Sequence, residues 1–64
     1  MRGPYQLTKT SIDQHVRRGV CGTYELLTSR NGSAEYTGRA HMDLNRRLKE
    51  HIGEGYSYFR FTAD

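Results

Sequence analysis

The sequence predicts a small α+β domain in which helices cover one side of a three-stranded antiparallel sheet, in the order α-β-β-α-β. Two observations lead to this fold class. An Asn-Gly pair lies between two strand-like segments, and Asn-Gly is the strongest short-range signal of a β-hairpin. Segments with a helical apolar repeat stand before and after this hairpin, and a run of aromatic residues, which favour strands, follows the second of them.

The N-terminal part of the chain, residues 1–19, is expected to form an irregular lead-in over residues 1–7 and a helix over residues 11–18. Ile12 and Val16 lie four positions apart, so both fall on one stripe of a helix. Residues that typically begin or end a helix flank this segment, namely Thr8, Thr10 and Gly19.

The motif-bearing core is expected over residues 20–61. Strands over residues 20–28 and 33–38 form the predicted hairpin. A helix over residues 41–52 follows the hairpin. Its apolar residues recur every four positions and are Leu44, Leu48 and Ile52. Residues 56–61, YSYFRF, are rich in aromatic side chains and are expected to form the third strand.

The length of the hairpin loop decides on which faces of the sheet two tyrosines lie. A three-residue loop, residues 30–32, places Tyr24 opposite Gly38 and directs Tyr24 and Tyr36 to the same face. Such a loop ends in a left-handed residue, a conformation that Gly32 adopts at little cost. A two-residue loop would direct the two tyrosines to opposite faces. A shared site requires the three-residue register, and we expect that register.

Length and composition indicate one domain, residues 1–64, with a small core. Only 34% of the residues are hydrophobic, and ten basic residues against seven acidic ones give a net charge of +3, which favours a polyanionic partner. Cys21 is the single cysteine, so an intramolecular disulfide is excluded and a reducing compartment is favoured. Neither a signal peptide nor an apolar run of about 18 residues is present, so we expect a cytoplasmic protein that does not enter a membrane.

Three short motifs follow one another in the expected core. GTY at residues 22–24 lies on the first hairpin strand, YTG at residues 36–38 lies on the second, and the helix holds Arg47 and His51 four positions apart. Together these motifs resemble the GIY, YIG and Arg-x-x-x-His elements of the GIY-YIG nucleases. This superfamily includes homing endonucleases, restriction enzymes and a nuclease of DNA excision repair. Both triplets have Thr in place of Ile, and Thr is also β-branched and compatible with a strand.

The resemblance implies a site for hydrolysis of DNA phosphodiester bonds, formed by Tyr24, Tyr36, Arg47 and His51. It implies that Tyr24 orders the attacking water or takes its proton, and that Arg47 stabilises charge on the pentacoordinate phosphate. Since a free phenol has a pKa near 10, the role of Tyr24 requires a nearby cation such as Arg47 to lower that pKa. The helical spacing agrees with this site, because Arg47 and His51 border the apolar stripe of the expected helix.

Three further basic residues are candidate DNA contacts: Arg39, Arg46 and Lys49. Arg46 and Lys49 are expected on the solvated side of the helix, and Arg39 lies shortly before the helix begins. The guanidinium group matches the geometry of phosphate oxygens. We therefore expect DNA affinity to fall steeply with salt and to depend on all three residues.

The resemblance also implies a divalent metal, Mg²⁺ or Mn²⁺, held by a Glu on a helix after the third strand. The sequence ends at Asp64, before such a helix, so the metal ligand is unassigned and a chain that is incomplete at its C-terminus is expected. Glu25 cannot replace that ligand, because it points to the face opposite Tyr24. Three functions stay open: an endonuclease that receives a carboxylate from outside this segment, a non-catalytic nucleic-acid-binding domain, and a protein-interaction domain with an exposed third strand.

Overall fold

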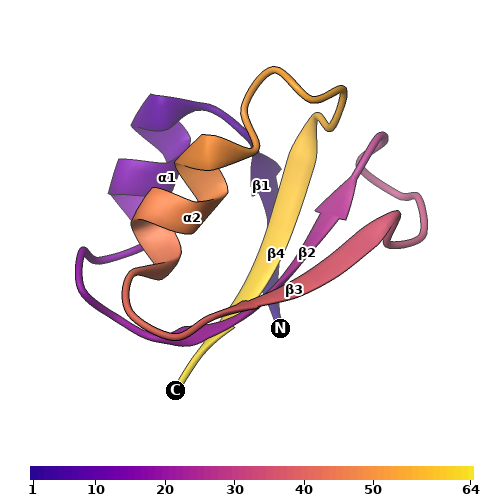
Figure 1. The fold of residues 1–64 in the computed structure, drawn as a ribbon. Coiled ribbons are helices and arrows are strands. Elements are labelled where there is room, and N and C mark those ends of the chain that lie inside the picture. The colour runs from indigo at the N-terminus through magenta and orange to yellow at the C-terminus, as the bar shows by residue number, and fades with distance from the viewer.

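The structure is a computed structural model that describes residues 1–64 as a four-stranded antiparallel sheet and two helices (Figure 1). Along the chain the elements are β1 (Arg2–Gln6), α1 (Lys9–His15), β2 (Gly22–Leu27), β3 (Tyr36–Ala40), α2 (Leu44–Glu50) and β4 (Tyr58–Ala63). The strands lie in the order β1-β4-β2-β3. The domain is of the α+β class, but the prediction of a three-stranded sheet is wrong, because a fourth strand precedes the first helix.

The additional strand, β1, occupies residues that the sequence pattern assigned to an irregular lead-in. It is an edge strand that pairs with β4 alone, with Arg2 opposite Phe61 and Tyr5 opposite Phe59. The pairing shifts between Arg2 and Tyr5, next to Pro4. Because proline lacks a backbone N–H, it is tolerated at sheet edges and bulges. The segment Arg2–Gln6 can therefore form an edge strand although it contains a proline.

Strand β4 lies in the interior of the sheet, between β1 and β2. It pairs with β2 along its whole length, with Phe59 opposite Leu26 and Phe61 opposite Tyr24. The predicted third strand is thus hydrogen-bonded to a neighbouring strand on both of its edges. The hypothesis of a protein-interaction domain loses the exposed strand on which it was based.

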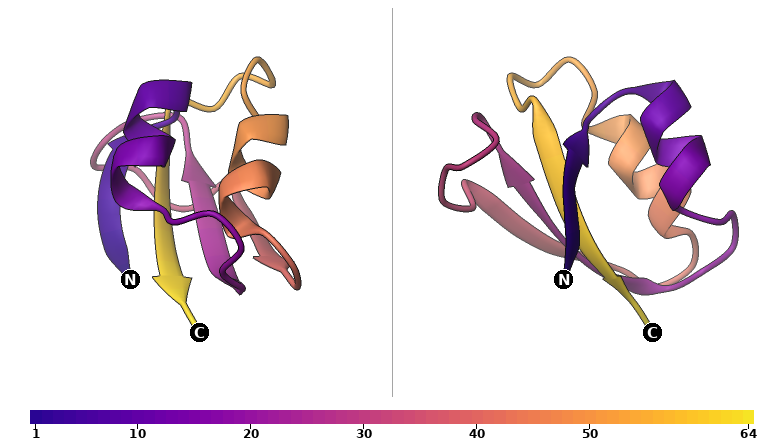
Figure 2. Two further views of the ribbon diagram at one scale, coloured as in Figure 1. Left: turned by 90° about the vertical axis from the view of Figure 1, so that its left-hand side faces the viewer. Right: turned by 180° about the vertical axis from the view of Figure 1, so that it is seen from behind.

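Both helices pack on one face of the sheet, and no helix covers the other face (Figures 1 and 2). Because side chains alternate along a strand, Tyr24 and Leu26 point toward the helices, whereas Thr23 and Glu25 lie on the uncovered face. Glu25 Oε1 lies 3.3 Å from Arg60 Nε there, so the predicted orientation of Glu25 away from Tyr24 is confirmed. The core between helices and sheet consists of Leu7, Ile12, Val16, Tyr24, Leu26, Ala40, Leu44, Leu48, Phe59 and Phe61.

Both helices are shorter than predicted, and polar side chains define where they begin. Thr8 caps α1, and Asp43 caps α2 by accepting the N–H of Arg46 at 3.3 Å. Helix α2 ends at Glu50, and the turn that follows leaves Ile52 38% exposed, so the apolar stripe of α2 is one residue shorter than predicted. With seven residues each, neither helix has the length or the apolar character needed to cross a membrane.

Polar contacts join α1 to α2. Lys49 Nζ lies 2.6 Å from Asp13 Oδ1, and the buried Asn45 donates to Asp13 Oδ1 at 3.0 Å and to the Val16 carbonyl at 2.8 Å. Hydrogen bonds from Lys49 and then Asn45 hold the pKa of Asp13 below its ordinary value. Lys49 therefore packs between the helices, with 24% of its side chain exposed, and the prediction that it lies on the solvated side of the helix is wrong.

Candidate functional site

Tyr24 and Tyr36 project from the same face of the hairpin formed by β2 and β3. Tyr24 is opposite Gly38, Leu26 is opposite Tyr36, and the ring centroids of the two tyrosines lie 6.1 Å apart. The predicted pairing is thus confirmed. The predicted loop is wrong, because the connection between the strands is longer than three residues and Gly32 does not have a positive φ.

Gly38 provides the room in which the ring of Tyr24 lies. A Cβ atom at Gly38 would come within 2.6 Å of both Cζ and the hydroxyl oxygen of Tyr24. The Tyr24 ring therefore lies directly over the glycine. Since Tyr24 is also fully buried, packing fixes the position of its hydroxyl group.

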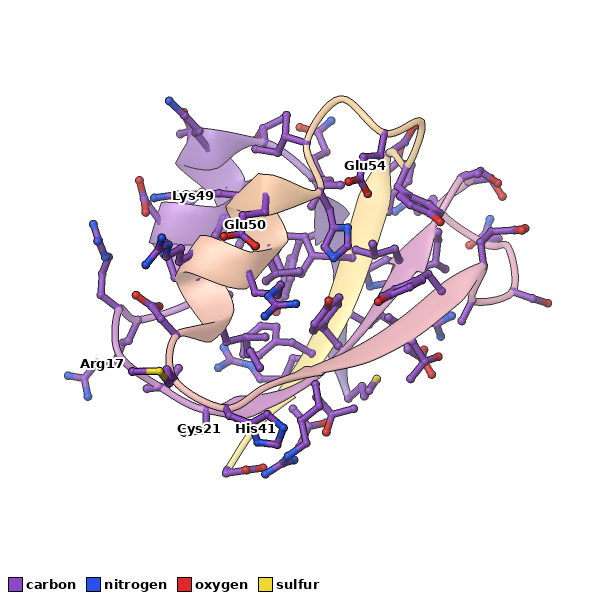
Figure 3. The ribbon with its side chains drawn as sticks, viewed as in Figure 1. Arg17, Cys21, His41, Lys49, Glu50 and Glu54 are labelled. Atoms are coloured by element: carbon purple, nitrogen blue, oxygen red, sulfur yellow. The ribbon has the colours of Figure 1, made fainter.

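His51 connects the hydroxyl of Tyr24 to a carboxylate in the turn after α2. The Tyr24 hydroxyl lies 2.8 Å from His51 Nε2, and Glu54 Oε1 lies 2.6 Å from His51 Nδ1. The imidazole also packs against Tyr36, with 5.2 Å between ring centroids. Figure 3 shows Glu54 in the connection between α2 and β4. Residues from β2, β3 and the end of α2 thus meet at one point, as the predicted site requires.

The rings of Tyr24, Tyr36 and His51 form a tyrosine cluster, which Arg47 reaches from α2. Burial raises the pKa of the Tyr24 phenol above its ordinary value, the adjacent Tyr36 adds to the increase, and the Arg47 guanidinium lowers the pKa in part. The pKa of Tyr24 is nevertheless raised overall. The expected role of Tyr24 as a base required a lowered pKa, and Arg47 does not provide it. Half of the Arg47 side chain is exposed, and its Nε lies 3.4 Å from Glu50 Oε1.

A cleft of about 630 Å³ lies along α2, and Arg47 belongs both to this cleft and to the tyrosine cluster. The charged residues that line the cleft also include Arg46, Asp43 and Glu50. The Glu50 carboxylate lies between two guanidinium groups, 3.4 Å from Arg47 Nε and 3.7 Å from Arg46 Nε. Figure 3 shows Glu50 on α2, and it shows His41, which also lines the cleft, just after the end of β3. An anion in the cleft would compete with Glu50 for both guanidinium groups.

The three residues predicted to bind DNA do not lie together. Arg46 lines the cleft and is well exposed. Lys49 faces α1 in the ion pair described above. Arg39 belongs to β3, where its guanidinium donates to Thr23 Oγ1 at 3.3 Å and to the carboxylate of Asp64. Because Thr23 lies on the uncovered face of the sheet, Arg39 is separated from the tyrosine cluster by the sheet itself.

Glu50 and Glu54 belong to the site, but the interpretation of the sequence considered them only as metal ligands, rejected them and gave them no other role. A signal was present for Glu50, because it follows Arg47 by three positions on α2, a spacing that brings side chains together on a helix. Glu54 also follows His51 by three positions, but it lies in the turn after α2, where the helical rule does not apply. No three His, Cys, Asp or Glu side chains in residues 1–64 come together in a group that could hold a metal ion. The ligand of the divalent metal that the resemblance implies therefore stays unassigned within residues 1–64.

Comparisons of the chain with protein-family models, with curated proteins and with solved structures find no match. The site is defined by its own geometry: the contacting rings of Tyr24, Tyr36 and His51, a buried hydroxyl bonded to the imidazole, and a neighbouring cleft with two guanidinium groups. The exposed Tyr36 hydroxyl and the guanidinium groups of Arg46 and Arg47 can donate hydrogen bonds to an anionic oxygen. The imidazole of His51 can accept a proton.

Proposed function

We propose that the chain is a DNA-binding domain that contacts the phosphodiester backbone at the exposed edge of the tyrosine cluster and in the adjoining cleft. The observation that supports this proposal most is the position of Arg47, which joins the cluster to the cleft. Tyr36, whose ring packs against that of Tyr24, is 42% exposed, and Arg46 lines the same cleft as Arg47. A phenol and two guanidinium groups are suitable donors for phosphate oxygens.

The resemblance to GIY-YIG nucleases supports the same class of ligand, and the net charge of +3 supports attraction to a polyanion. A cytoplasmic setting is part of the proposal. Cys21 is a free thiol that donates to the carbonyl of His41 at 2.8 Å, a state that a reducing compartment preserves.

Phosphodiester hydrolysis is the second candidate, and the hydrogen bond between Tyr24 and His51 favours it. In such a reaction His51 would accept the proton of Tyr24 while Arg47 stabilises charge on the phosphate. A metal bound through a carboxylate from outside residues 1–64 would supply Lewis-acid chemistry. The complete burial of Tyr24 and its raised pKa oppose its use as a base, so binding is the primary proposal.

Binding of a fluorescent DNA duplex, measured by anisotropy, tests the primary proposal. Arg47→Ala should weaken binding about tenfold, the equivalent of about 1.4 kcal/mol for one charge-assisted hydrogen bond. Arg17→Ala removes the same charge from an exposed position that Figure 3 shows on the far side of α2 from Glu54, and it should leave binding nearly unchanged. Equal losses in both variants would indicate general charge attraction and contradict the proposed surface.

Supercoiled plasmid incubated with Mg²⁺ or Mn²⁺ tests the second candidate. If the domain nicks the plasmid, Arg47→Ala should lower the rate by roughly 10²–10³-fold, as expected for the loss of one donor to the transition state. A domain that binds the duplex but never nicks the plasmid would exclude hydrolysis by these residues and leave the binding proposal intact.

A further inference from the structure

We propose that Glu54 is a positioning residue that holds the neutral His51 ring in the Nδ1–H tautomer, so that the Tyr24 hydroxyl must donate its proton toward His51. The use of this arrangement in contacting DNA rests on the function proposed above. The tautomer itself is a property of the free protein and can be measured without DNA.

The geometry of the hydrogen bonds points to this tautomer. Glu54 Oε1 lies 2.6 Å from His51 Nδ1, and an ionised carboxylate can only accept a hydrogen bond. Nδ1 therefore carries the hydrogen, which leaves Nε2 of the neutral ring as an acceptor. The Tyr24 hydroxyl, 2.8 Å from Nε2, is then the donor of that bond. Only 13% of the His51 side chain is exposed, so water has little access to compete for either nitrogen.

The turn after α2 brings Glu54 back to His51. Gly53 and Gly55 have φ angles of 92° and 102°, in the left-handed range that glycine adopts without strain. The Glu54 N–H bonds to the His51 carbonyl at 3.3 Å, which closes the turn. Two glycines thus direct one carboxylate to the imidazole, although the Glu54 side chain is itself half exposed and contributes nothing to the buried core.

The tautomer determines what Tyr24 can do. With Nδ1–H facing Glu54, the buried Tyr24 oxygen keeps its lone pairs free to accept from a neighbouring donor such as the Arg47 guanidinium. If the phenol loses its proton, the O–H bond breaks, an Nε2–H bond forms, and the Glu54 carboxylate stabilises the resulting imidazolium. In the opposite tautomer, Nε2–H would donate to the Tyr24 oxygen and no proton could pass to the ring. Glu54 acts on this hydroxyl through His51 and contacts no ligand itself.

The test is the long-range ¹H–¹⁵N correlation spectrum of the His51 imidazole, recorded through a pH titration so that the neutral form is observed. We expect a pyrrole-type Nδ1 and a pyridine-type Nε2 in the parent protein. Glu54→Gln keeps an acceptor oxygen and should keep this tautomer. In Glu54→Ala the Nδ1–H form should become the minor one, while the control Glu35→Ala, at an exposed loop carboxylate, should match the parent.

A parent spectrum with a pyridine-type Nδ1, or an unchanged tautomer in Glu54→Ala, would overturn the proposal. Backbone amide spectra that match the parent outside the turn would show that Glu54→Ala is folded. Were that variant to unfold, Glu54→Gln would decide, because loss of the Nδ1–H tautomer there contradicts positioning by an acceptor oxygen. A domain that shows the expected tautomers but binds no DNA would leave the role of Glu54 intact and remove only the proposed function.

Discussion

At the scale of single residues, Gly38 on β3 determines where the Tyr24 hydroxyl lies. Gly38 does not have a positive φ, so an alanine there would be tolerated by the backbone. Its Cβ would instead meet the buried Tyr24 ring at 2.6 Å. We expect Gly38→Ala to lower the free energy of unfolding by about 1–3 kcal/mol, as overpacking does, and to disrupt the bond to His51. Urea denaturation measures the first effect and imidazole spectra measure the second.

A double-mutant cycle separates this clash from a general effect of alanine in β3. In a Tyr24→Leu background, Gly38→Ala should cost less free energy of unfolding than in the parent, because the ring that it displaces is gone. Thr37→Ala, at the adjacent position on the opposite face, serves as a control for strand propensity. Additive costs for Tyr24→Leu and Gly38→Ala would contradict the packing argument.

Glu50 is expected to oppose binding of a phosphate. Its single carboxylate pairs with the guanidinium groups of both Arg46 and Arg47, which a phosphate oxygen would otherwise contact. All three side chains are at least half exposed, so these ion pairs contribute only about 0.2–1 kcal/mol. Glu50→Gln should therefore strengthen DNA binding by about two- to fivefold in the anisotropy measurement.

The matched control for this prediction is Glu25→Gln. Glu25 also pairs with an arginine, Arg60, but on the uncovered face of the sheet, and its replacement changes the net charge by the same amount. If binding occurs at the cleft, Glu50→Gln should have the larger effect. A stronger effect of Glu25→Gln would shift the binding surface to the uncovered face.

At the scale of secondary-structure elements, Asp43 fastens the start of α2 to the chain segment that follows α1. Its carboxylate accepts the N–H of Gly19 at 3.1 Å as well as the N–H of Arg46. The Gly19 N–H is the main cause that holds the pKa of Asp43 below its ordinary value, and the Arg46 N–H and the Arg18 charge add to the effect. The folded state therefore binds this proton less readily than the unfolded state.

The sign of the pH dependence follows from that lowered pKa. The contribution of Asp43 to the free energy of unfolding is complete above its unfolded pKa, about 4, and is lost as pH falls through the lower, folded value. Asn is an equally good N-cap but does not titrate, so Asp43→Asn should flatten the fall in stability below about pH 4. Urea midpoints at neutral and acidic pH measure this, with Glu35→Gln as a control at a loop residue without an ion pair. An acid dependence identical to that of the parent would contradict the assignment.

The elements that could be predicted from the sequence are those whose signals are local. The pairing of Tyr24 with Gly38 was predicted from an assumed three-residue loop, because only that register directs both tyrosines to one face; the pairing is confirmed although the loop is longer. Strand β1 could not be predicted in this way. Its partner β4 lies at the other end of the chain, and Pro4 weakens its own signal, so only tertiary pairing makes it a strand. Glu54 was missed for a similar reason, since its contact depends on the conformation of a glycine turn.

At the scale of the whole molecule, basic residues are divided between two surfaces separated by the sheet. Arg46 and Arg47 lie along the cleft on the helical side, whereas Arg39 and Arg60 lie on the uncovered face. Intramolecular carboxylates already occupy the guanidinium groups of Arg39 and Arg60, and Lys49 is bound between the helices. The net charge of +3 would attract DNA to either surface, so affinity alone cannot identify the surface that binds.

The salt dependence of binding can identify it. Each phosphate contact releases condensed counterions, so log Kd plotted against log salt changes slope by about one unit per contact. We expect Arg46→Ala and Arg47→Ala each to reduce the slope by about that amount. Arg39→Ala and Lys49→Ala should leave the slope unchanged, because the first lies behind the sheet with its guanidinium bound to Asp64 and the second is held by α1. A slope reduced by Arg39→Ala and unaffected by Arg46→Ala would place DNA on the uncovered face, and the tyrosine cluster would then have no part in binding.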